Sequence, residues 1–137
     1  MAERIFDIVT NLKNKCLDKE LSIQKEYLLS PAEYNGLLSV EPDAVYNCNQ
    51  LSKKLGLSVS RSSRILDKLI TNGYLKRIRD NVDRRLLKVT LTEKGLSARR
   101  KINERLDECE KDILSRLQKS ELYLLENTLN KLSDIFI

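Results

Sequence analysis

A cluster of arginine and lysine residues is the part of this chain best suited to chemistry, because such cations bind phosphates. Between Ser58 and Lys88 the sequence has nine Lys/Arg and three Asp/Glu, a local charge of +6 in a chain whose net charge is +5. The positive charge is therefore concentrated in one segment. Cations placed on a nucleic-acid backbone release condensed counterions, so a patch of this kind indicates a nucleic-acid-binding surface.

The composition argues against other kinds of site. The chain has no histidine, and so lacks both the commonest general base near neutral pH and a common transition-metal ligand. Its three cysteines, Cys16, Cys48 and Cys109, are far apart in the sequence, which argues against a zinc site or a disulfide framework. We find no nucleophile motif. The sequence therefore predicts no catalytic residue, no cofactor, no metal and no enzymatic activity.

Length and hydropathy set the broad class of protein. The chain of 137 residues is 41% hydrophobic and 33% charged, which fits one globular domain with an oligomerisation arm. Its apolar runs are all shorter than the roughly 20 residues that span a bilayer. The first residues begin an amphipathic pattern rather than a signal peptide. We expect a cytoplasmic protein with no membrane partner.

Two consecutive helices should carry the basic residues. Asn47 and Gln50 form a capping signal for a first helix that Gly56 ends, and residues 59–72 form a second helix closed by Gly73. The second helix has one face toward the core and the opposite face toward solvent. Its inward residues are Ser62, Ile65, Leu66, Leu69 and Ile70, and its outward residues are Ser60, Arg61, Arg64, Asp67, Lys68 and Thr71. The outward stripe is a candidate recognition surface; the alternative is an ordinary solvated helix face.

The pattern after Gly73 changes from helical to alternating. Residues 75–79 and 86–91 read as two strands on either side of a polar tip at residues 80–85. Arg85 lies at this tip, where its guanidinium could enter a narrow minor groove of strongly negative potential. A simple surface hairpin is the alternative. Coupled to the preceding helices, however, the hairpin is better explained as the wing of a winged helix-turn-helix.

Helices should flank this unit on both sides. The sequence predicts a first helix with Ile5, Ile8, Val9, Leu12 and Cys16 on one face, a helix from Pro31 to about Val40, a long helix from Thr92 to about Leu117, and a last one from Ser120. In the last helix an apolar seam joins Leu122, Leu125, Leu129, Leu132 and Phe136. These faces exceed what a small winged domain can cover. They favour a two-fold dimer over an intrachain helix hairpin.

The predicted fold is therefore mainly α with a small β-wing. We expect a winged helix-turn-helix DNA-binding domain at residues 30–95 and dimerisation helices at residues 1–29 and 96–137. A two-fold protein matches two-fold operator DNA, so the expected partners are double-stranded DNA and a second copy of the chain.

Three segments give the sequence a specific resemblance. The run Leu29-Ser30-Pro31-Ala32-Glu33-Tyr34, the helix pair leading to Asn72-Gly73-Tyr74-Leu75, and Asp83-Arg84-Arg85 followed by Leu91-Thr92-Glu93-Lys94-Gly95 are found in this order. The chain resembles the MarR (multiple antibiotic resistance regulator) family of bacterial transcription regulators over essentially its whole length. The loop at residues 41–46 has no strong counterpart in the family pattern.

The resemblance implies a homodimer with its fourth helices in successive major grooves and its wings in flanking minor grooves. It implies that Ser58, Ser60, Arg61, Ser62 and Arg64 contact bases or phosphates, with Lys68 in the same basic stripe. It also implies that Arg85 is the wing-tip arginine, that Asp83 orients it, and that Arg79, Arg84 and Lys88 contact the DNA backbone.

The expected function is a transcription regulator, most simply a repressor that occludes a pseudo-palindromic operator. The resemblance implies release by a small apolar or phenolic effector, for which Tyr27, Tyr34 and Tyr46 are candidate pocket residues, with core packing as the alternative. Cys16, near Lys13, Lys15 and Lys19, is a candidate redox sensor, although simple packing also explains such a cysteine. A winged-helix module that binds an acidic protein remains a different class of explanation.

Overall fold

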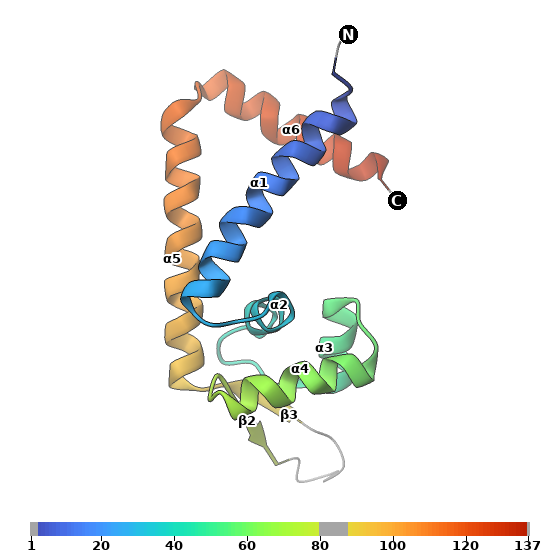
Figure 1. Cartoon of the computed structure of the whole chain (residues 1–137), viewed down its shortest axis with the longest axis vertical. Coiled ribbons are helices and arrows are strands. Elements are labelled where there is room, and N and C mark those ends of the chain that lie inside the picture. Colours follow the sequence, from blue (N-terminus) through green and yellow to red (C-terminus); the bar gives the residue numbers. More distant parts are fainter. Residues whose placement is uncertain (1–2, 80–87, 137) are drawn as a thin grey trace. The chain divides into compact units, whose positions relative to one another are not determined.

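The computed structural model describes residues 3–79 and 88–136, and in them it confirms a mainly helical fold with a small sheet (Figure 1). The helices are α1 (Ile5–Glu26), α2 (Pro31–Ser39), α3 (Cys48–Leu55), α4 (Val59–Thr71), α5 (Glu93–Arg116) and α6 (Lys119–Ile135). The strands are β1 (Tyr46–Asn47), β2 (Leu75–Ile78) and β3 (Lys88–Leu91). None of these described helices is both long and apolar enough to cross a membrane.

The helix starts follow the capping signals in the sequence. At α2 the Ser30 hydroxyl accepts from the Glu33 amide at 3.1 Å, and the Ser30 amide donates to the Glu33 carboxylate at 2.8 Å. Asn47 and Gln50 make the same reciprocal pair at α3, with both distances 2.8 Å. Each pair satisfies backbone donors that a helix start leaves exposed. Helix α6 begins at Lys119, one residue before the predicted opening at Ser120.

A left-handed glycine makes the turn between α3 and α4. Gly56 has φ 67°, and the amides of Gly56 and Leu57 donate to Lys53 O and Ser52 O at 3.3 and 3.0 Å. This is the hydrogen-bond pattern that ends a helix and redirects the chain within two residues. Ser58 then caps α4, because its hydroxyl accepts from the Arg61 amide at 3.2 Å. The predicted helix-turn-helix is confirmed.

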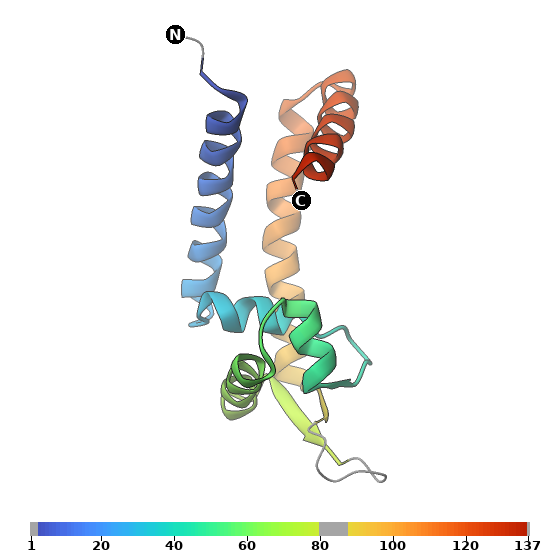
Figure 2. The same ribbon diagram turned by 90° about the vertical axis from the view of Figure 1, so that its right-hand side faces the viewer.

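The core of the lobe that contains the helix-turn-helix lies where α2, α3 and α4 meet the sheet (Figure 2). Its fully buried side chains include Leu37 from α2, Leu51 from α3, Leu66 and Leu69 from α4, and Val89 from β3. Gly36 allows α2 to approach α4 closely, since a Cβ at residue 36 would lie 3.0 Å from Ile65 Cγ2. The inward residues of α4 were all predicted from its period.

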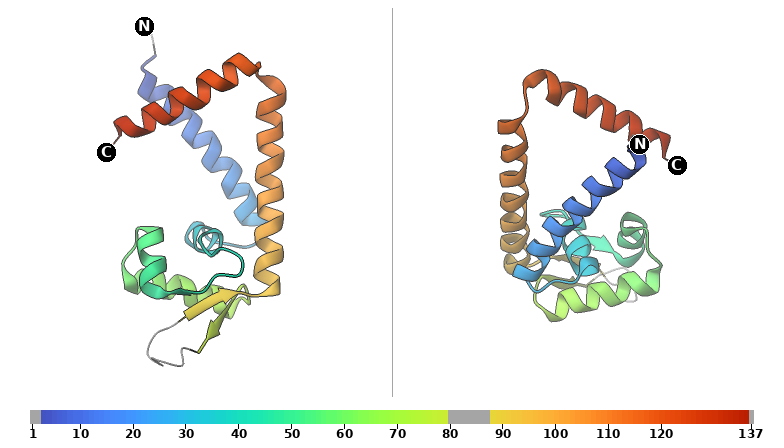
Figure 3. Two further views of the ribbon diagram at one scale, coloured as in Figure 1. Left: turned by 180° about the vertical axis from the view of Figure 1, so that it is seen from behind. Right: turned by 45° about the horizontal axis from the view of Figure 1, so that its top comes forward.

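The sheet has three antiparallel strands in the order β1-β3-β2. Strands β2 and β3 are the two arrows at the base of the ribbon (Figure 3). Leu75 pairs with Leu91 and Arg77 with Val89, while Tyr46 of β1 pairs with Val89 on the other side. Strand β1 was not predicted. Two residues are too few to show an alternating pattern, and their pairing partner lies far along the chain.

A clasp at residues 91–95 joins the start of α5 to the end of α4. The Thr92 amide donates to Tyr74 O at 3.1 Å, and the Thr92 hydroxyl accepts from the Gly95 amide at 3.0 Å while lying within hydrogen-bond distance of the Gly73 and Tyr74 carbonyls. A Cβ at Gly95 would lie only 2.1 Å from Tyr74 O. The Thr92-to-Gly95 motif is therefore a packing device that fixes α5 against the chain leaving α4.

The chain forms two compact units, residues 1–102 and residues 103–137. The first contains the lobe, the packed end of α1 with Ile23 and Gln24, and the start of α5 with Ala98 and Ile102. The second contains the rest of α5 and α6, and α6 has no buried residue. This packing division differs from the predicted functional division into a lobe at residues 30–95 and arms at residues 1–29 and 96–137, which stays a prediction.

Candidate nucleic-acid interface

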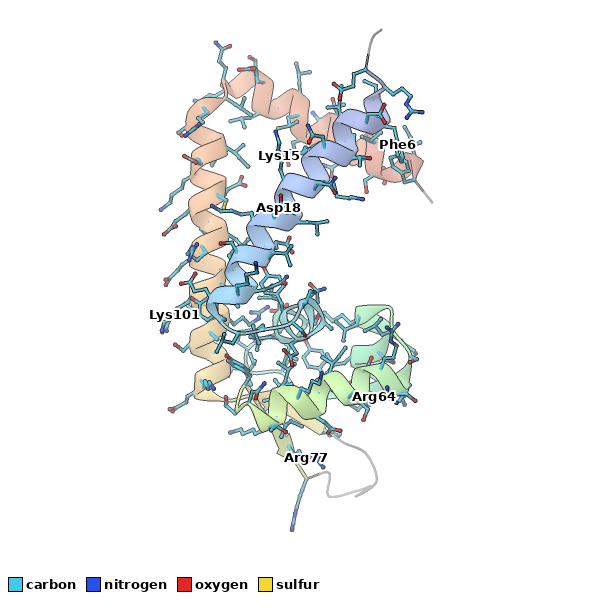
Figure 4. The ribbon with its side chains drawn as sticks, in the orientation of Figure 1. Phe6, Lys15, Asp18, Arg64, Arg77 and Lys101 are labelled. Atoms are coloured by element: carbon cyan, nitrogen blue, oxygen red, sulfur yellow. The ribbon has the colours of Figure 1, made fainter. Side chains whose placement is uncertain are left out.

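Helix α4 presents a basic face to the solvent. Arg61, Arg64 and Lys68 are exposed, together with Ser60, Asp67 and Thr71, while the opposite face is buried in the lobe. Figure 4 shows Arg64 on α4 and Arg77 on β2 at the same end of the first unit. A rigid helix held by its buried face can place such cations in a groove of duplex DNA without further ordering.

The serines near the start of α4 have different environments. Ser58 and Ser60 are exposed, and Ser58 also caps the helix. Ser62 is fully buried, so its predicted contact with DNA is wrong in this structure. The reason is the helical period of about 3.6 residues, which places residue 62 on the same face as Ile65, Leu66 and Leu69.

Two of the residues predicted to contact the DNA backbone lie in or beside the sheet. Arg79 is exposed just after β2, and Lys88 is half-buried at the start of β3, opposite Ile78 in the register. Asp83, Arg84 and Arg85 lie outside the described residues. Their roles at the wing therefore stay predictions.

An ion pair between α4 and β2 was not predicted. Arg77 Nη2 lies 3.2 Å from Asp67 Oδ1, and both side chains are more than half exposed, at 63% and 55%. The strand alternation was the available signal, because it places Arg77 on the same face of β2 as the buried Leu75. A charged residue on that face must extend its guanidinium past the core toward solvent or toward an acid.

A second set of contacts fixes the end of α2 behind the interface. Arg99 of α5 donates to Leu38 O at 3.0 Å and to Glu41 Oε2 at 3.2 Å, and Lys54 of α3 donates to Ser39 O at 2.6 Å. Cations suit the carbonyls at a helix C-terminus. These contacts connect α2, α3 and α5, so they hold the helix-turn-helix in place. The sequence pattern gave no sign of them, since the partners are far apart in the chain.

The cysteines differ in exposure. Cys16 on α1 is exposed, whereas Cys48 is half-buried at the start of α3 and its thiol lies 3.5 Å from Val59 O. Burial, and then the nearby Asp67 charge, raise the pKa of the Cys48 thiol. A raised pKa makes a thiol less reactive near neutral pH. Redox sensing by Cys16 stays a prediction.

A small open cavity of about 190 Å³ lies beside the clasp. Tyr27, Leu28, Asn72, Tyr74 and Lys94 line it. Of the three tyrosines predicted as pocket residues, only Tyr27 lines this cavity. Tyr34 is buried in the core, and Tyr46 in β1 lies beneath the Lys54 ammonium, 5.2 Å from the ring centre. Drug-sized ligands need roughly 300–1,000 Å³, so this cavity suits only a small group.

Across residues 3–79 and 88–136, no group of three or more Cys, Asp or Glu side chains is arranged to hold a metal ion. The chemistry on this surface is that of exposed arginines and lysines on a rigid scaffold. Such groups bind anions through charge and hydrogen bonds.

Comparison with known proteins finds similar chains among transcription regulators. The model of the MarR family matches residues 29–87. The chain is 23% identical over 133 residues to the Bacillus subtilis HTH-type transcriptional regulator YsmB, covering 95% of this chain and 91% of that protein. It is 27% identical over 124 residues to the transcriptional repressor MprA of Escherichia coli K12, covering 89% of this chain and 70% of that protein.

Solved structures share the fold. The crystal structure of Streptococcus pneumoniae FabT in complex with DNA has a TM-score of 0.85 and 21% identity, covering 96% of this chain and 94% of that one. The reduced form of MarR from E. coli has a TM-score of 0.77 and 20% identity, covering 96% and 98% of the two chains.

Proposed function

We propose that the chain is a DNA-binding transcription regulator of the MarR family, and that it is a homodimeric repressor that occludes a pseudo-palindromic operator. The observation that carries the proposal is the exposed basic face of α4, with Arg61, Arg64 and Lys68 on a helix whose other face is buried. The similarity to the repressor MprA and to FabT in its DNA complex supports it.

In this proposal α4 enters the major groove. Thirteen helical residues span roughly 20 Å at 1.5 Å per residue, and the first two turns carry Ser60, Arg61 and Arg64. Arginines can bind guanine edges in a bidentate way, while serine hydroxyls and Lys68 suit phosphate oxygens. Arg85 would enter the minor groove with Asp83 orienting it, and Arg79, Arg84 and Lys88 would contact the backbone.

The dimer would form through the apolar surfaces of the terminal helices. Ile5, Phe6 and Leu12 of α1 are 67%, 60% and 51% exposed, and Leu124 and Leu129 of α6 are 63% and 43% exposed. So much exposed apolar surface is unusual in a soluble monomer and typical of an oligomer interface. A second copy, related by a two-fold axis, would cover these side chains and present two α4 helices to successive major grooves.

A salt titration tests the proposal. We expect the affinity for a duplex from the chain's own promoter region to fall steeply as salt is raised, because phosphate contacts release counterions. An affinity that ignores salt would exclude this role.

A pair of single substitutions locates the interface. Arg64→Ala should weaken duplex binding by about 1–3 kcal/mol, or roughly 5- to 150-fold, if its guanidinium contacts a base. Lys101→Ala is the matched control, because it removes one positive charge from an exposed residue of α5 (Figure 4). Equal losses for the two variants would mean that only net charge matters. If both variants bound duplex as tightly as wild type, but Arg64→Ala no longer bound an acidic partner protein, the chain would be a protein-interaction module.

The regulation of binding is a finer part of the proposal. A small apolar or phenolic effector would release the DNA, and the duplex affinity measured with salicylate present tests for such an effect. The exposure of Cys16 favours a second mode, in which oxidation of this thiol changes affinity. Peroxide treatment that leaves the duplex affinity of wild type and Cys16→Ser equally unchanged would remove this mode. The proposed site of action is the cytoplasm, and no catalytic step is involved.

A further inference from the structure

Asp67 is an acid in the middle of a surface that is otherwise basic. On the outward face of α4 it lies between Arg64 and Lys68 in sequence and is 55% exposed. A carboxylate there repels DNA phosphates and costs affinity. Its position therefore requires an explanation other than simple attraction of DNA.

The neighbouring arginine supplies that explanation. Arg77 Nη2 donates to Asp67 Oδ1 at 3.2 Å, which joins the outward face of α4 to strand β2. The turn at Asn72 and Gly73 returns the chain along α4, so residue 77 comes back beside residue 67. A guanidinium that donates to a carboxylate has fewer orientations open to it, and its other N–H groups stay available to a further acceptor.

The register of the sheet explains why Arg77 is held there. Arg77 pairs with Val89, which is fully buried, and it shares a face of β2 with Leu75. Cross-strand partners lie on the same face, about 5 Å apart at Cβ, so the stem of Arg77 starts on the core side of the sheet. The guanidinium leaves the core at the side of α4. The exposed Lys76 lies on the other face of the strand.

We propose that Arg77 binds a DNA phosphate between the groove positions of α4 and the wing, and that Asp67 is its positioning residue. The inference rests on the proposed DNA-binding function and deepens it. A phosphate contact fixed to α4 sets the register of the helix in the groove. Asp67 thus lowers the nonspecific affinity for DNA but increases the preference for one DNA sequence. Without Asp67, a freely moving Arg77 could bind phosphates in many registers of α4 along the groove.

The decisive variant is Asp67→Asn, which removes a negative charge while keeping the side-chain size. Two probes are compared: a duplex that the wild-type protein selects from a random-sequence pool, and a mixed-sequence duplex. Charge alone predicts tighter binding to both. The positioning role predicts about fivefold weaker binding to the selected duplex and tighter binding to the mixed one, so that the ratio of the two affinities falls. An equal increase for both duplexes would overturn the inference.

Substitutions of Arg77 test the phosphate contact. Arg77→Ala should weaken binding to both duplexes and reduce the slope of log affinity against log salt by about one. Arg77→Lys should restore most of that slope, because it keeps the charge, but not the preference for the selected duplex, because lysine lacks the planar fork. Lys76→Ala is the matched control on the opposite face of β2. An Arg77→Ala slope equal to that of wild type would refute the contact.

A double-mutant cycle separates this inference from the proposed function. In Asp67→Asn/Arg77→Ala the loss of selectivity should match that of Arg77→Ala alone, since Asp67 acts through Arg77. Additive losses would show that Asp67 acts independently. If Arg64→Ala weakens duplex binding while the Asp67 and Arg77 variants have no effect, only this inference fails. If wild type retains no duplex from the random-sequence pool and does not bind the mixed-sequence duplex, the proposed function fails. Equal thermal unfolding midpoints for all variants would exclude misfolding as the cause.

Discussion

Helices α4 and α6 are both amphipathic, but their apolar faces have opposite environments. Helix α4 buries Ile65, Leu66 and Leu69 among the helices and sheet of its own lobe. Helix α6, although four residues longer, buries none of its side chains among the residues that the structure describes. The lobe therefore completes its own core, whereas α6 is a surface that a second chain would complete.

The difference arises from the contacts that close each region. In the lobe two capping boxes fix the starts of α2 and α3, the Gly56 turn joins α3 to α4, and the clasp from Thr92 to Gly95 fixes α5 against the chain that leaves α4. The exposed apolar residues are concentrated in the terminal helices, among them Ile5 in α1 and Ile135 in α6, at 67% and 71%. A self-contained lobe and exposed apolar surfaces on the terminal helices fit the proposed dimer.

The largest effect should come from breaking the clasp in the lobe. Gly95→Ala places a Cβ 2.1 Å from Tyr74 O, a backbone atom that cannot move away alone. We expect the free energy of unfolding to fall by about 3 kcal/mol, measured by urea denaturation. Gly56→Ala is the comparison, since its φ of 67° is strained but nothing lies within 4 Å of the new Cβ. That variant should lose about 1 kcal/mol. Similar losses in the free energy of unfolding for the two variants would mean that residue 95 is not closely packed against Tyr74 O.

Breaking the arm should separate the chains while leaving the lobe folded. Leu129→Asp places a carboxylate in the apolar seam of α6, where the side chain is 43% exposed in the single chain. We expect monomers by analytical ultracentrifugation and an affinity for operator DNA about 100-fold lower, because the second half-site is no longer linked. Asn127→Asp adds the same charge on the far side of the helix and should stay dimeric. A Leu129→Asp variant with the wild-type sedimentation coefficient would contradict dimerisation through this seam.

The junction between α1 and the lobe can be tested with a stabilising change. Leu28 follows α1 with φ 56° and is 87% exposed, while the amides of Leu28 and Leu29 bond to Lys25 O and Gln24 O. This is a helix-ending motif in which glycine is favoured. Leu28→Gly should therefore raise the free energy of unfolding by about 0.5–1 kcal/mol, seen as a higher thermal midpoint. Leu28→Ala controls for loss of the side chain and should have little effect. A loss of stability in both would indicate that a second chain covers Leu28.

The smallest effect concerns the thiol of the lobe. Burial and then the charge of Asp67 raise the pKa of Cys48, so less thiolate is present at a given pH than for an ordinary cysteine. In a Cys16→Ser/Cys109→Ser background, the rate of iodoacetamide alkylation should reach half its maximum at a higher pH than in a short cysteine peptide. Adding Asp67→Asn should move this midpoint down, because one unfavourable charge is removed. A midpoint equal to that of the peptide would indicate a more open lobe than the structure describes.

Local signals predicted most of the lobe. Ser30 with Glu33, Asn47 with Gln50, and Gly56 each act within a few residues, so their roles can be read directly from the chain. The periodicity of α4 correctly gave Arg64 as outward. The same pattern placed Ser62 inward, and its inclusion among the DNA contacts, which came from resemblance by position, was wrong because that side chain is fully buried.

Contacts between distant residues were not predictable in this way. Strand β1 pairs with β3 across more than 40 residues, as the register of Tyr46 and Val89 shows. Arg99 meets Leu38 O, and Arg77 meets Asp67, only after the chain has folded back. Each partner is an ordinary charged or polar residue in its local sequence. Nothing in the pattern around it distinguishes it from a solvated side chain.

The sequence by itself determined where the helices begin and end, which of their faces are apolar, and where positive charge gathers. These properties depend on the helical period, on capping and on glycine, all of which act over a few residues. Only the tertiary structure decided which charges are paired, that β1 joins the sheet beside β3, and that Gly95 must be a glycine. The physical reason is that pairing, burial and close approach depend on where distant segments meet, and a local pattern does not specify that meeting.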